Sequence, residues 1–249
     1  MKISVFVITK NEEKNIERCL SSVAWAQEIV VVDSGSTDGT CRIARRFTDK
    51  VFMHEFTDYA SQKNFALSKT TGEWVLSLDA DEKVSAALGK EILAAASATD
   101  TAEAYRVPRI SYIFGRRFRH TGTSGDQPIR FFRRDAGQFD QPIHETVQVR
   151  GKISRLNHPI FHYTYPSVHD YLDKLNHYTS MEADLFIKKR QIRPQINQYG
   201  VKPLLMFLRL YVWEQGFRDG VEGFFFSALS AYYVFIKHAK HFEKLENLL

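Results

Sequence analysis

The chain has 249 residues, of which 44% are hydrophobic and 25% are charged, and it contains two cysteines, Cys19 and Cys41. This composition is typical of a folded globular protein and argues against a disordered chain or a disulfide scaffold. The net charge of +5 and the pI near 9.1 favour anionic partners, such as nucleotides, nucleic acid or an acidic membrane surface, without choosing among them.

The first hundred residues alternate between strand and helix patterns. Apolar runs at 3–8, 28–33, 50–56 and 74–79 predict buried strands, and residues 13–26, 41–47 and 59–70 have helical patterns. This alternation predicts a parallel sheet with crossover helices, in which ligands bind outside the carboxyl ends of the strands. The polar stretches TKNEE, DSGSTDG and DADEK follow three of these strands and should lie together at that edge.

The pattern changes after residue 103. Residues 104–120 and 127–134 are rich in arginine and aromatic side chains, and they predict antiparallel strands joined by long loops. Residues 167–190 predict a helix, and the apolar stretches 202–213 and 223–236 follow it. We expect a first domain over 1–165, with halves 1–103 and 104–165, and a helical region over 166–249.

The ends of the chain bear on its location. The short apolar run at the N-terminus turns acidic at once and lacks the cleavage site of a signal peptide, so a cytoplasmic location is expected. The two C-terminal apolar stretches are too short to span a bilayer. They would pack in the core, form a homo-oligomer, or lie in a membrane interface beside Lys237, Lys240 and Lys244, and we expect weak peripheral association with the inner face of the cytoplasmic membrane.

Several common ligand motifs are missing from the predicted sheet edge. No glycine fingerprint follows the first strand, no P-loop is present, and DSGSTDG lacks the acids of a calcium loop. HETVQ is not a zinc protease motif, because Gln148 stands where the second histidine belongs. An anionic ligand at this acidic edge would need a bridging cation, and Mg²⁺ or Mn²⁺ commonly joins carboxylates to phosphates. Asp79 and Asp81 point to the same side of an extended segment and suit that role.

Four ordered motifs, SVFVITKNEEKNIERCLSSV, EIVVVDSGSTDGT, QKNFAL and LSLDADE, resemble the N-terminal half of the family 2 glycosyltransferases. IRFFRR…FDQPIHETV, PIFHYTYPSVHDYLDKLNHY and GFRDGVEGFFFSALSAYYVF are similar to bacterial lipopolysaccharide core β-1,4-glucosyltransferases. The resemblance implies an α/β, GT-A (nucleotide-diphospho-sugar transferase) fold. Its mostly parallel, Rossmann-like sheet would carry helices on both faces, with a C-terminal helical extension. Residues 1–103 would bind the nucleotide and 104–165 the acceptor.

The resemblance also implies a set of residues that bind the nucleotide sugar: Thr9, Asn11, Glu12, Asp33, Lys63, Asp79, Ala80 and Arg130. Ordinary structural roles compete with these assignments, because residues 9–12 resemble a helix cap, Asp33 a strand-end acid and Lys63 a surface lysine. Arg130, Arg133 and Arg134 would reach the diphosphate or a phosphorylated acceptor, since arginine forms bidentate contacts with phosphate. Arg130 and Arg134 share strand parity and should point the same way.

The expected metal ligands are Asp81, Asp79 and His162, with Asp81 as the direct ligand of Mn²⁺ or Mg²⁺. Glu82 is expected to favour the N-terminus of a following helix instead. For catalysis, the resemblance implies that Glu145 of the motif IHETV is the general base and that His144 orients the acceptor or the carboxylate. A structural acid and a hydrogen-bonded strand histidine are the competing interpretations.

The resemblance thus implies an inverting hexosyltransferase that works by metal-assisted single displacement, with UDP-glucose as the glucose donor and the lipopolysaccharide inner core as the acceptor. Exopolysaccharide, a lipid-linked oligosaccharide or a peptide thiol are alternative acceptors. A sugar-1-phosphate nucleotidylyltransferase would need a glycine-rich basic loop after the first strand, which is missing. A basic nucleic-acid-binding module is disfavoured, because the acidic edge would repel a phosphate backbone.

Overall fold

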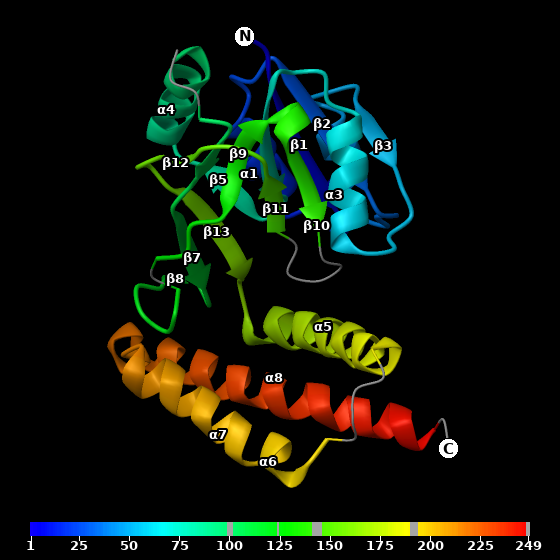
Figure 1. Ribbon diagram of the computed structural model, residues 1–249, viewed down its shortest axis with the longest axis vertical. Helices are drawn as coiled ribbons and strands as arrows, with labels where there is room; N and C mark the ends of the chain where they lie inside the picture. The colour runs from blue at the N-terminus through cyan, green and yellow to red at the C-terminus, as the bar shows by residue number, and fades with distance from the viewer. Residues whose placement is uncertain (99–101, 124, 141–145, 190–193, 248–249) are drawn as a thin grey trace. The chain divides into compact units, whose positions relative to one another are not determined.

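The computed structural model describes residues 1–98, 102–123, 125–140, 146–189 and 194–247. The chain forms two compact units, drawn in Figure 1. The sheet unit comprises Met1–Arg109 and Asp126–His162, and the helical unit comprises Ile110–Gly125 and Tyr163–Leu249. Residues 110–125, which lie inside the first domain expected from the sequence, therefore group with the helices.

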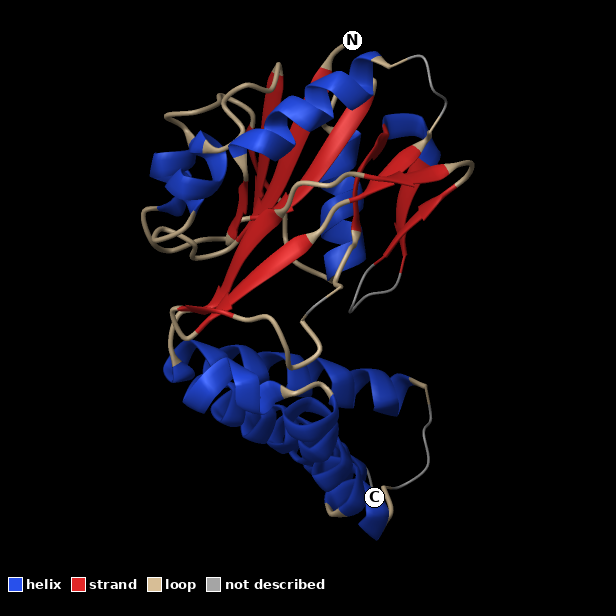
Figure 2. Cartoon of the chain, turned by 90° about the vertical axis from the view of Figure 1, so that its left-hand side faces the viewer, coloured by secondary structure: helices blue, strands red, loops and turns tan. Residues whose placement is uncertain are grey.

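A seven-stranded sheet, found within the described residues and drawn in red in Figure 2, organises the sheet unit in the order β12-β6-β9-β4-β1-β2-β3. β3, β2, β1 and β4 are parallel neighbours, β9 is antiparallel to both β4 and β6, and β12 is parallel to β6. The strands are β1 Ile3–Thr9, β2 Glu28–Asp33, β3 Val51–Met53, β4 Trp74–Asp79, β6 Ala104–Arg106, β9 Ile129–Arg133 and β12 Ile153–Arg155.

Both faces of this sheet are covered, because side chains alternate along each strand. On one face Val5, Val31 and Leu76 pack in a cluster with residues of α1 Ile16–Ser21, α2 Thr40–Ala44 and α4 Ala86–Ser97. On the other face Phe6 and Val75 pack with residues of α3 Tyr59–Ser68 and of the hairpin β10 Gly137–Asp140 and β11 Thr146–Val149. The α/β fold with helices on both faces is thereby confirmed.

The strand register aligns the carboxyl ends of the central strands. Thr9 lies opposite Asp33, and Ile8 lies opposite Asp79, so β1, β2 and β4 end at one level. The polar segments that follow them start at one edge of the sheet, as the alternation of strands and helices predicted.

The segment after β4 differs from its expected form. Residues Glu82–Val84 form a short strand, β5, that pairs antiparallel with β13 Ile160–Tyr165. The next helix, α4, begins only after Ser85, whose side chain accepts a hydrogen bond from the Leu88 N–H. Glu82 therefore lies outside the first turn of that helix, and the expected helix-dipole role is wrong.

The helical unit contains α5 Val168–Lys188, α6 Ile196–Tyr199, α7 Val201–Leu208 and α8 Gly220–Glu246. A π-helical turn at Arg209–Trp213 extends α7, a 3-10 turn at Gly216–Asp219 precedes α8, and a second 3-10 turn, Arg134–Ala136, lies in the sheet unit. The strands β7 Arg109–Ile113 and β8 Arg116–Arg117 form a hairpin, and β7 and β13 run from one unit into the other.

Buried Asp219 fastens the loop after β8 to the start of α8. Its carboxylate accepts hydrogen bonds from the backbone N–H groups of Arg119 and His120, at 3.0 and 2.9 Å. Along α5, Tyr171, Leu175, Thr179 and Ala183 recur at intervals of four and form its buried face. Among the described residues, no helix combines the length and the apolar character that crossing a membrane requires.

Candidate active site

The loops after β1 and β2 are tied together by side chains from the TKNEE and DSGSTDG segments. Asn11 Oδ1 accepts a hydrogen bond from the Thr37 N–H at 2.8 Å, and the Asn11 N–H donates to Ser36 Oγ at 2.8 Å. The Glu12 N–H donates to Thr40 Oγ1 at 2.8 Å. These contacts hold the two loops in fixed positions at the carboxyl edge of the sheet.

Asp33 ends β2 and is fully buried beneath the second loop. Its Oδ1 accepts hydrogen bonds from the N–H groups of Gly35 and Ser36, at 3.0 and 2.8 Å. Gly35 has φ +83°, which a residue with a Cβ seldom adopts, so glycine is needed for this tight turn. Thr9 at the end of β1 is also buried, and its Oγ1 makes no hydrogen bond to the described residues.

Asp79, at the end of β4, lies between two cations. Its Oδ1 is 2.8 Å from Lys63 Nζ, and its Oδ2 is 2.6 Å from Arg130 Nη2. Burial alone would raise the pKa of Asp79, but attraction to Arg130 and Lys63 holds that pKa well below its usual range. Lys63 is only 1% exposed, so the structure excludes the solvated surface lysine that competed with its assigned role.

Glu82 extends the contacts of Asp79 into the protein interior, because the residue is 0% exposed. Its Oε1 lies 2.8 Å from Arg130 Nη2 and 3.4 Å from Arg109 Nη1, and its Oε2 accepts the Asp79 N–H at 3.0 Å. Arg109 in turn contacts Asp126 at 2.6 Å. Lys63, Arg130 and Arg109 thus face Asp79, Glu82 and Asp126 in a charge-balanced network, which we call the β4-end network.

Asp81 and His162 form a separate pair beside the β4-end network. Pairing of β5 with β13 brings them together, and Asp81 Oδ1 lies 3.3 Å from His162 Nε2. Neighbouring ligands of an octahedral Mg²⁺ or Mn²⁺ ion are about 3 Å apart, so these oxygen and nitrogen donors fit two adjacent positions on such an ion. Ala80, between the two aspartates, is 4% exposed.

The expected trio of metal ligands is only partly assembled. Among the described residues, no group of three or more His, Cys, Asp or Glu side chains is arranged to hold a metal ion. Asp79 contacts Lys63 and Arg130, whereas Asp81 and His162 face each other. Within the described part of the chain, Asp81 and His162 are therefore the members of the expected trio that lie together.

The QKN motif on α3 has a distinct contact for each residue. Gln62 Nε2 donates to Ser34 Oγ in the loop after β2 at 2.8 Å, and Lys63 pairs with Asp79. Asn64 exchanges two hydrogen bonds with the backbone of Phe139 in β10, at 2.9 and 3.0 Å. The expected catalytic residues Glu145 and His144 lie outside the described residues. In the sequence they come between β10, which Asn64 holds, and β11, which pairs with β10.

Arg133 and Arg134 lie at the other end of the sheet from Asp79. Arg133 is paired with Trp74, at the start of β4, and its guanidinium covers the Trp74 ring at 4.7 Å. Because β9 ends at Arg133, Arg134 begins a 3-10 turn and contacts Asp135. The expectation that Arg130 and Arg134 share strand parity is therefore wrong.

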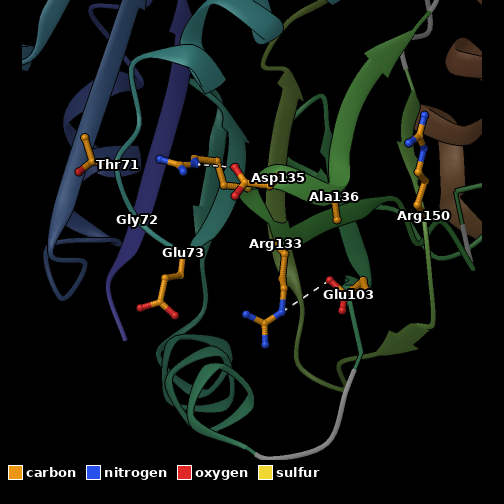
Figure 3. A pocket seen from close by; sticks show the side chains of 9 residues that line it. Thr71, Gly72, Glu73, Glu103, Arg133, Asp135, Ala136 and Arg150 are labelled. Atoms are coloured by element: carbon orange, nitrogen blue, oxygen red, sulfur yellow. Dashed lines mark hydrogen bonds and ion pairs between the residues drawn. The ribbon is translucent and has the colours of Figure 1, made fainter.

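A pocket of about 420 Å³ lies beside Arg133 and Arg134 (Figure 3). Its lining residues are Thr71, Gly72, Glu73, Glu103, Arg133, Arg134, Asp135, Ala136 and Arg150. Figure 3 marks the contact of Arg133 with Glu103, at 3.6 Å, and that of Arg134 with Asp135, at 3.0 Å. Acids and arginines are mixed here, so the pocket lacks the single sign of charge that a phosphate site would present.

The sequence did not predict Arg109 and Asp126 as residues of the site, nor the interior position of Glu82. Arg109 begins β7 and reaches Glu82, which is 27 positions earlier in the chain. No local sequence pattern predicts a contact between residues so far apart in the chain. The one available signal was the unusual number of charges, three carboxylates in DADE, next to a strand that the sequence already predicted to be buried.

The sheet order and the acidic residues after β4 define the GT-A class of fold, as solved structures of similar proteins confirm. A mannosyltransferase from Pyrobaculum calidifontis, solved with GDP-mannose and Mn²⁺, is similar with a TM-score of 0.55 at 17% identity, covering 96% of this chain and 86% of that one. Glucosyl-3-phosphoglycerate synthase from Mycobacterium tuberculosis, solved with Mn²⁺ and UDP, gives 0.51 at 20% identity, covering 74% and 78%.

Residues 4–155 match the profile of glycosyl transferase family 2, and the chain belongs to that family. Among curated proteins, the lipopolysaccharide core biosynthesis glycosyltransferase LpsC of Rhizobium meliloti is 31% identical over 252 residues, which cover 98% of this chain and 93% of LpsC. An uncharacterised glycosyltransferase of Rickettsia typhi is also 31% identical, with 96% and 86% covered.

Proposed function

We propose that this glycosyltransferase moves glucose from UDP-glucose to a saccharide of the lipopolysaccharide inner core, with inversion at the anomeric carbon. Similarity over nearly the whole length to LpsC, named for lipopolysaccharide core biosynthesis, supports the acceptor class. A core acceptor is joined to a lipid, so the proposal includes peripheral attachment of the enzyme to the inner face of the cytoplasmic membrane.

The observation that carries the proposal is the Asp81–His162 pair beside the carboxyl end of β4. Its two ligand atoms, 3.3 Å apart, would hold Mn²⁺ or Mg²⁺, and the donor diphosphate would complete the ion's coordination. When bound, the ion neutralises charge that develops on the departing diphosphate. The β4-end network keeps Asp79 ionised and fixes the backbone from which Asp81 projects.

The remaining residues have roles in binding and proton transfer. The linked loops after β1 and β2 would bind the base and ribose through Thr9, Asn11, Glu12 and Asp33, and Lys63 and Arg130 would support the diphosphate side through Asp79. The acceptor hydroxyl oxygen forms a bond to the anomeric carbon while the bond from that carbon to the diphosphate oxygen breaks. Glu145 would take the hydroxyl proton, and His144 would orient the acceptor.

A donor panel tests the proposal directly. UDP-glucose, UDP-galactose, UDP-N-acetylglucosamine and GDP-mannose are each added with Mn²⁺, and the melting temperature of the protein is measured. A ligand that binds only the folded state raises that temperature, so UDP-glucose should give the largest rise, and the rise should vanish with EDTA. A panel in which no sugar nucleotide changes the melting temperature would overturn the donor assignment.

A further inference from the structure

Helix α7 presents an apolar stripe to solvent. Val201, Leu204, Leu205 and Leu208 occupy positions i, i+3, i+4 and i+7 of one helix face, and Val212 follows in the π-helical turn that extends α7. All five are exposed, with Leu204 at 58% and Leu205 at 50%. In a soluble protein such a stripe normally faces the core, so its exposure marks an interaction surface.

Helix α8 carries a second apolar stripe, whose members lie within about 100° of one another around the helix axis. Its members are Val221, Phe224, Phe225, Tyr232 and Phe235, and each is exposed. The opposite side of the helix already has a buried face, made of Gly223, Ser227, Val234, His238 and His241. The apolar side chains of the second stripe are therefore additional to those that hold the helical unit together.

The two stripes form one surface. α7 packs against α8 (Figure 1). The Phe224 ring lies 5.7 Å from the Phe207 ring and 5.6 Å from the Tyr211 ring. Trp213, 75% exposed, and Phe217, 53% exposed, follow where the π-helical turn ends α7. We call this set of exposed residues from Val201 to Phe235 the α7–α8 surface.

The charges on and beside the surface have a small positive excess, because four cations, Lys202, Arg209, Arg218 and Arg116, stand against three acids, Glu214, Asp219 and Glu222. Lys202, Arg209 and Arg218 are exposed on the elements that carry the stripes. Of the nearby acids, Glu214 lies 3.8 Å from Arg209, Glu222 lies 3.1 Å from Arg116, and Asp219 is buried. A cationic rim around an apolar face complements a bilayer that contains anionic lipids.

The lysines expected beside the membrane are placed differently. Lys237 contacts Glu182 at 3.0 Å and Lys244 contacts Asp184, both of which lie on α5. Lys240 Nζ is within 2.7–2.9 Å of oxygen atoms of Asn176, Thr179 and Ser180 on the same helix. These three lysines stabilise the α5–α8 contact, so the expected basic flank is wrong.

We propose that the α7–α8 surface inserts into one leaflet of a bilayer that contains anionic phospholipid, with α7 and α8 lying in the plane of the interface. This inference rests on the proposed function, because it identifies the surface that would bring the enzyme to a lipid-linked acceptor. Trp213 lies in the headgroup region, where indole rings are favoured, and Lys202, Arg209 and Arg218 contact lipid phosphates. A bilayer fits better than a second copy of the chain, because the cationic rims of two copies would repel each other.

Vesicle sedimentation with the full chain tests the proposal. The wild-type protein should co-sediment with vesicles of phosphatidylcholine and 30% phosphatidylglycerol, which is a chosen composition of about the anionic content that attracts basic surfaces. The Leu204→Glu/Leu205→Glu variant should bind at least about tenfold more weakly, since it removes two inserted side chains and adds two negative charges. Lys202→Gln/Arg218→Gln should weaken binding only to the anionic vesicles.

A matched control separates insertion from charge alone. Leu93→Glu/Leu172→Glu adds the same two charges at exposed leucines of α4 and α5, outside the α7–α8 surface, and should bind within about twofold of wild type. Circular dichroism of each variant verifies that it is folded. Equal binding by the wild type and Leu204→Glu/Leu205→Glu would overturn the proposal, and so would a wild-type protein that binds no vesicle.

The oligomeric state of the protein distinguishes a bilayer from a second copy of the chain as the partner of the α7–α8 surface. If light scattering shows a wild-type dimer that Leu204→Glu/Leu205→Glu converts to a monomer, the surface is an interface between copies and the lipid proposal is wrong. A wild-type monomer supports it. Mn²⁺-dependent hydrolysis of UDP-glucose, measured without lipid, tests the proposed function separately. A protein that binds vesicles without hydrolysing UDP-glucose would contradict the proposed function alone. A protein that hydrolyses UDP-glucose without binding vesicles would contradict the membrane proposal alone.

Discussion

Lys63 Nζ lies 2.8 Å from Asp79 Oδ1, although the lysine is 1% exposed and the aspartate stands at the open end of a strand. A buried ammonium without a counter-charge is strongly unfavourable, so the lysine and the carboxylate depend on each other. Asp79 also contacts Arg130 at 2.6 Å, which means that the end of β4 is fixed before any ligand arrives.

Lys63→Met should destabilise the fold by about 2 kcal/mol, measured by urea unfolding. The expected loss is below the 3–5 kcal/mol typical of a broken buried pair, because the Asp79 side chain is 30% exposed and keeps Arg130. The double variant Lys63→Met/Asp79→Asn should lose less than the sum of the two single changes. Additive losses would show that the pair contributes no coupling.

Asp81→Ala should abolish Mn²⁺-dependent hydrolysis of the donor, and His162→Gln should raise the Mn²⁺ concentration needed for half-maximal activity. Both changes remove a ligand atom from the pair that faces an ion in the proposed site. Asp49→Ala, at an exposed acid before the start of β3, is the control and should behave as wild type. Unchanged activity in Asp81→Ala would remove the metal role.

Glu145→Gln should reduce kcat for transfer by at least about a hundredfold, the usual scale of general-base catalysis, without changing the affinity for UDP-glucose. Binding is followed by calorimetry and transfer by product formation. If donor affinity collapses together with turnover, Glu145 belongs to the binding site. Glu73→Gln, beside the pocket at the other end of β4, provides the matched control.

Glu28 predicts a pH dependence of stability. Burial alone would raise its pKa, but hydrogen bonds from Lys50, Ser4 and Thr71 lower the pKa from 4.5 to about 2. Because the folded pKa lies below the unfolded one, the ionised form favours the native state. This contribution, about 3 kcal/mol, is fully present above about pH 4.5 and is lost as the pH falls towards 2.

The test for Glu28 is urea unfolding between pH 2 and 7 for the wild type and for Glu28→Gln. The variant should be less stable at pH 7, and the difference between the two proteins should shrink as the pH falls below 4.5. A difference that stays constant across this range would show that Glu28 does not carry the dependence. The ion pairs of Asp79 act in the same direction, since its pKa is also lowered.

The sequence predicted the strands, because continuous apolar runs such as residues 28–33 have no stable position except a buried sheet. It also predicted that Thr9, Asp33 and Asp79 share an edge, since parallel strands align their carboxyl ends. It did not predict that Glu82 meets Arg109 and Arg130, because the geometry of contacts 27 and 48 residues apart is absent from local periodicity.

The errors at Arg134 and at the lysines of α8 have different physical causes. Parity along a strand holds only while the strand continues, and β9 ends one residue before Arg134. The helical spacing of Leu204 and Leu208 correctly indicates one apolar face, but spacing says nothing about which partner covers it. The lysines of α8 were expected beside a membrane interface, because their partners on α5, about 60 positions earlier, cannot be read from local periodicity.

Gln62, Lys63 and Asn64 connect α3 to three separate parts of the sheet unit. Three consecutive residues point in directions about 100° apart, and each holds a different part of the sheet unit: the loop after β2, the end of β4 and the hairpin strand β10. An insertion of one residue within 59–61 would rotate all three side chains away from their partners at once. Insertions after Ser68 would leave them in place, so α3 should tolerate changes in length at its C-terminus and none at its start.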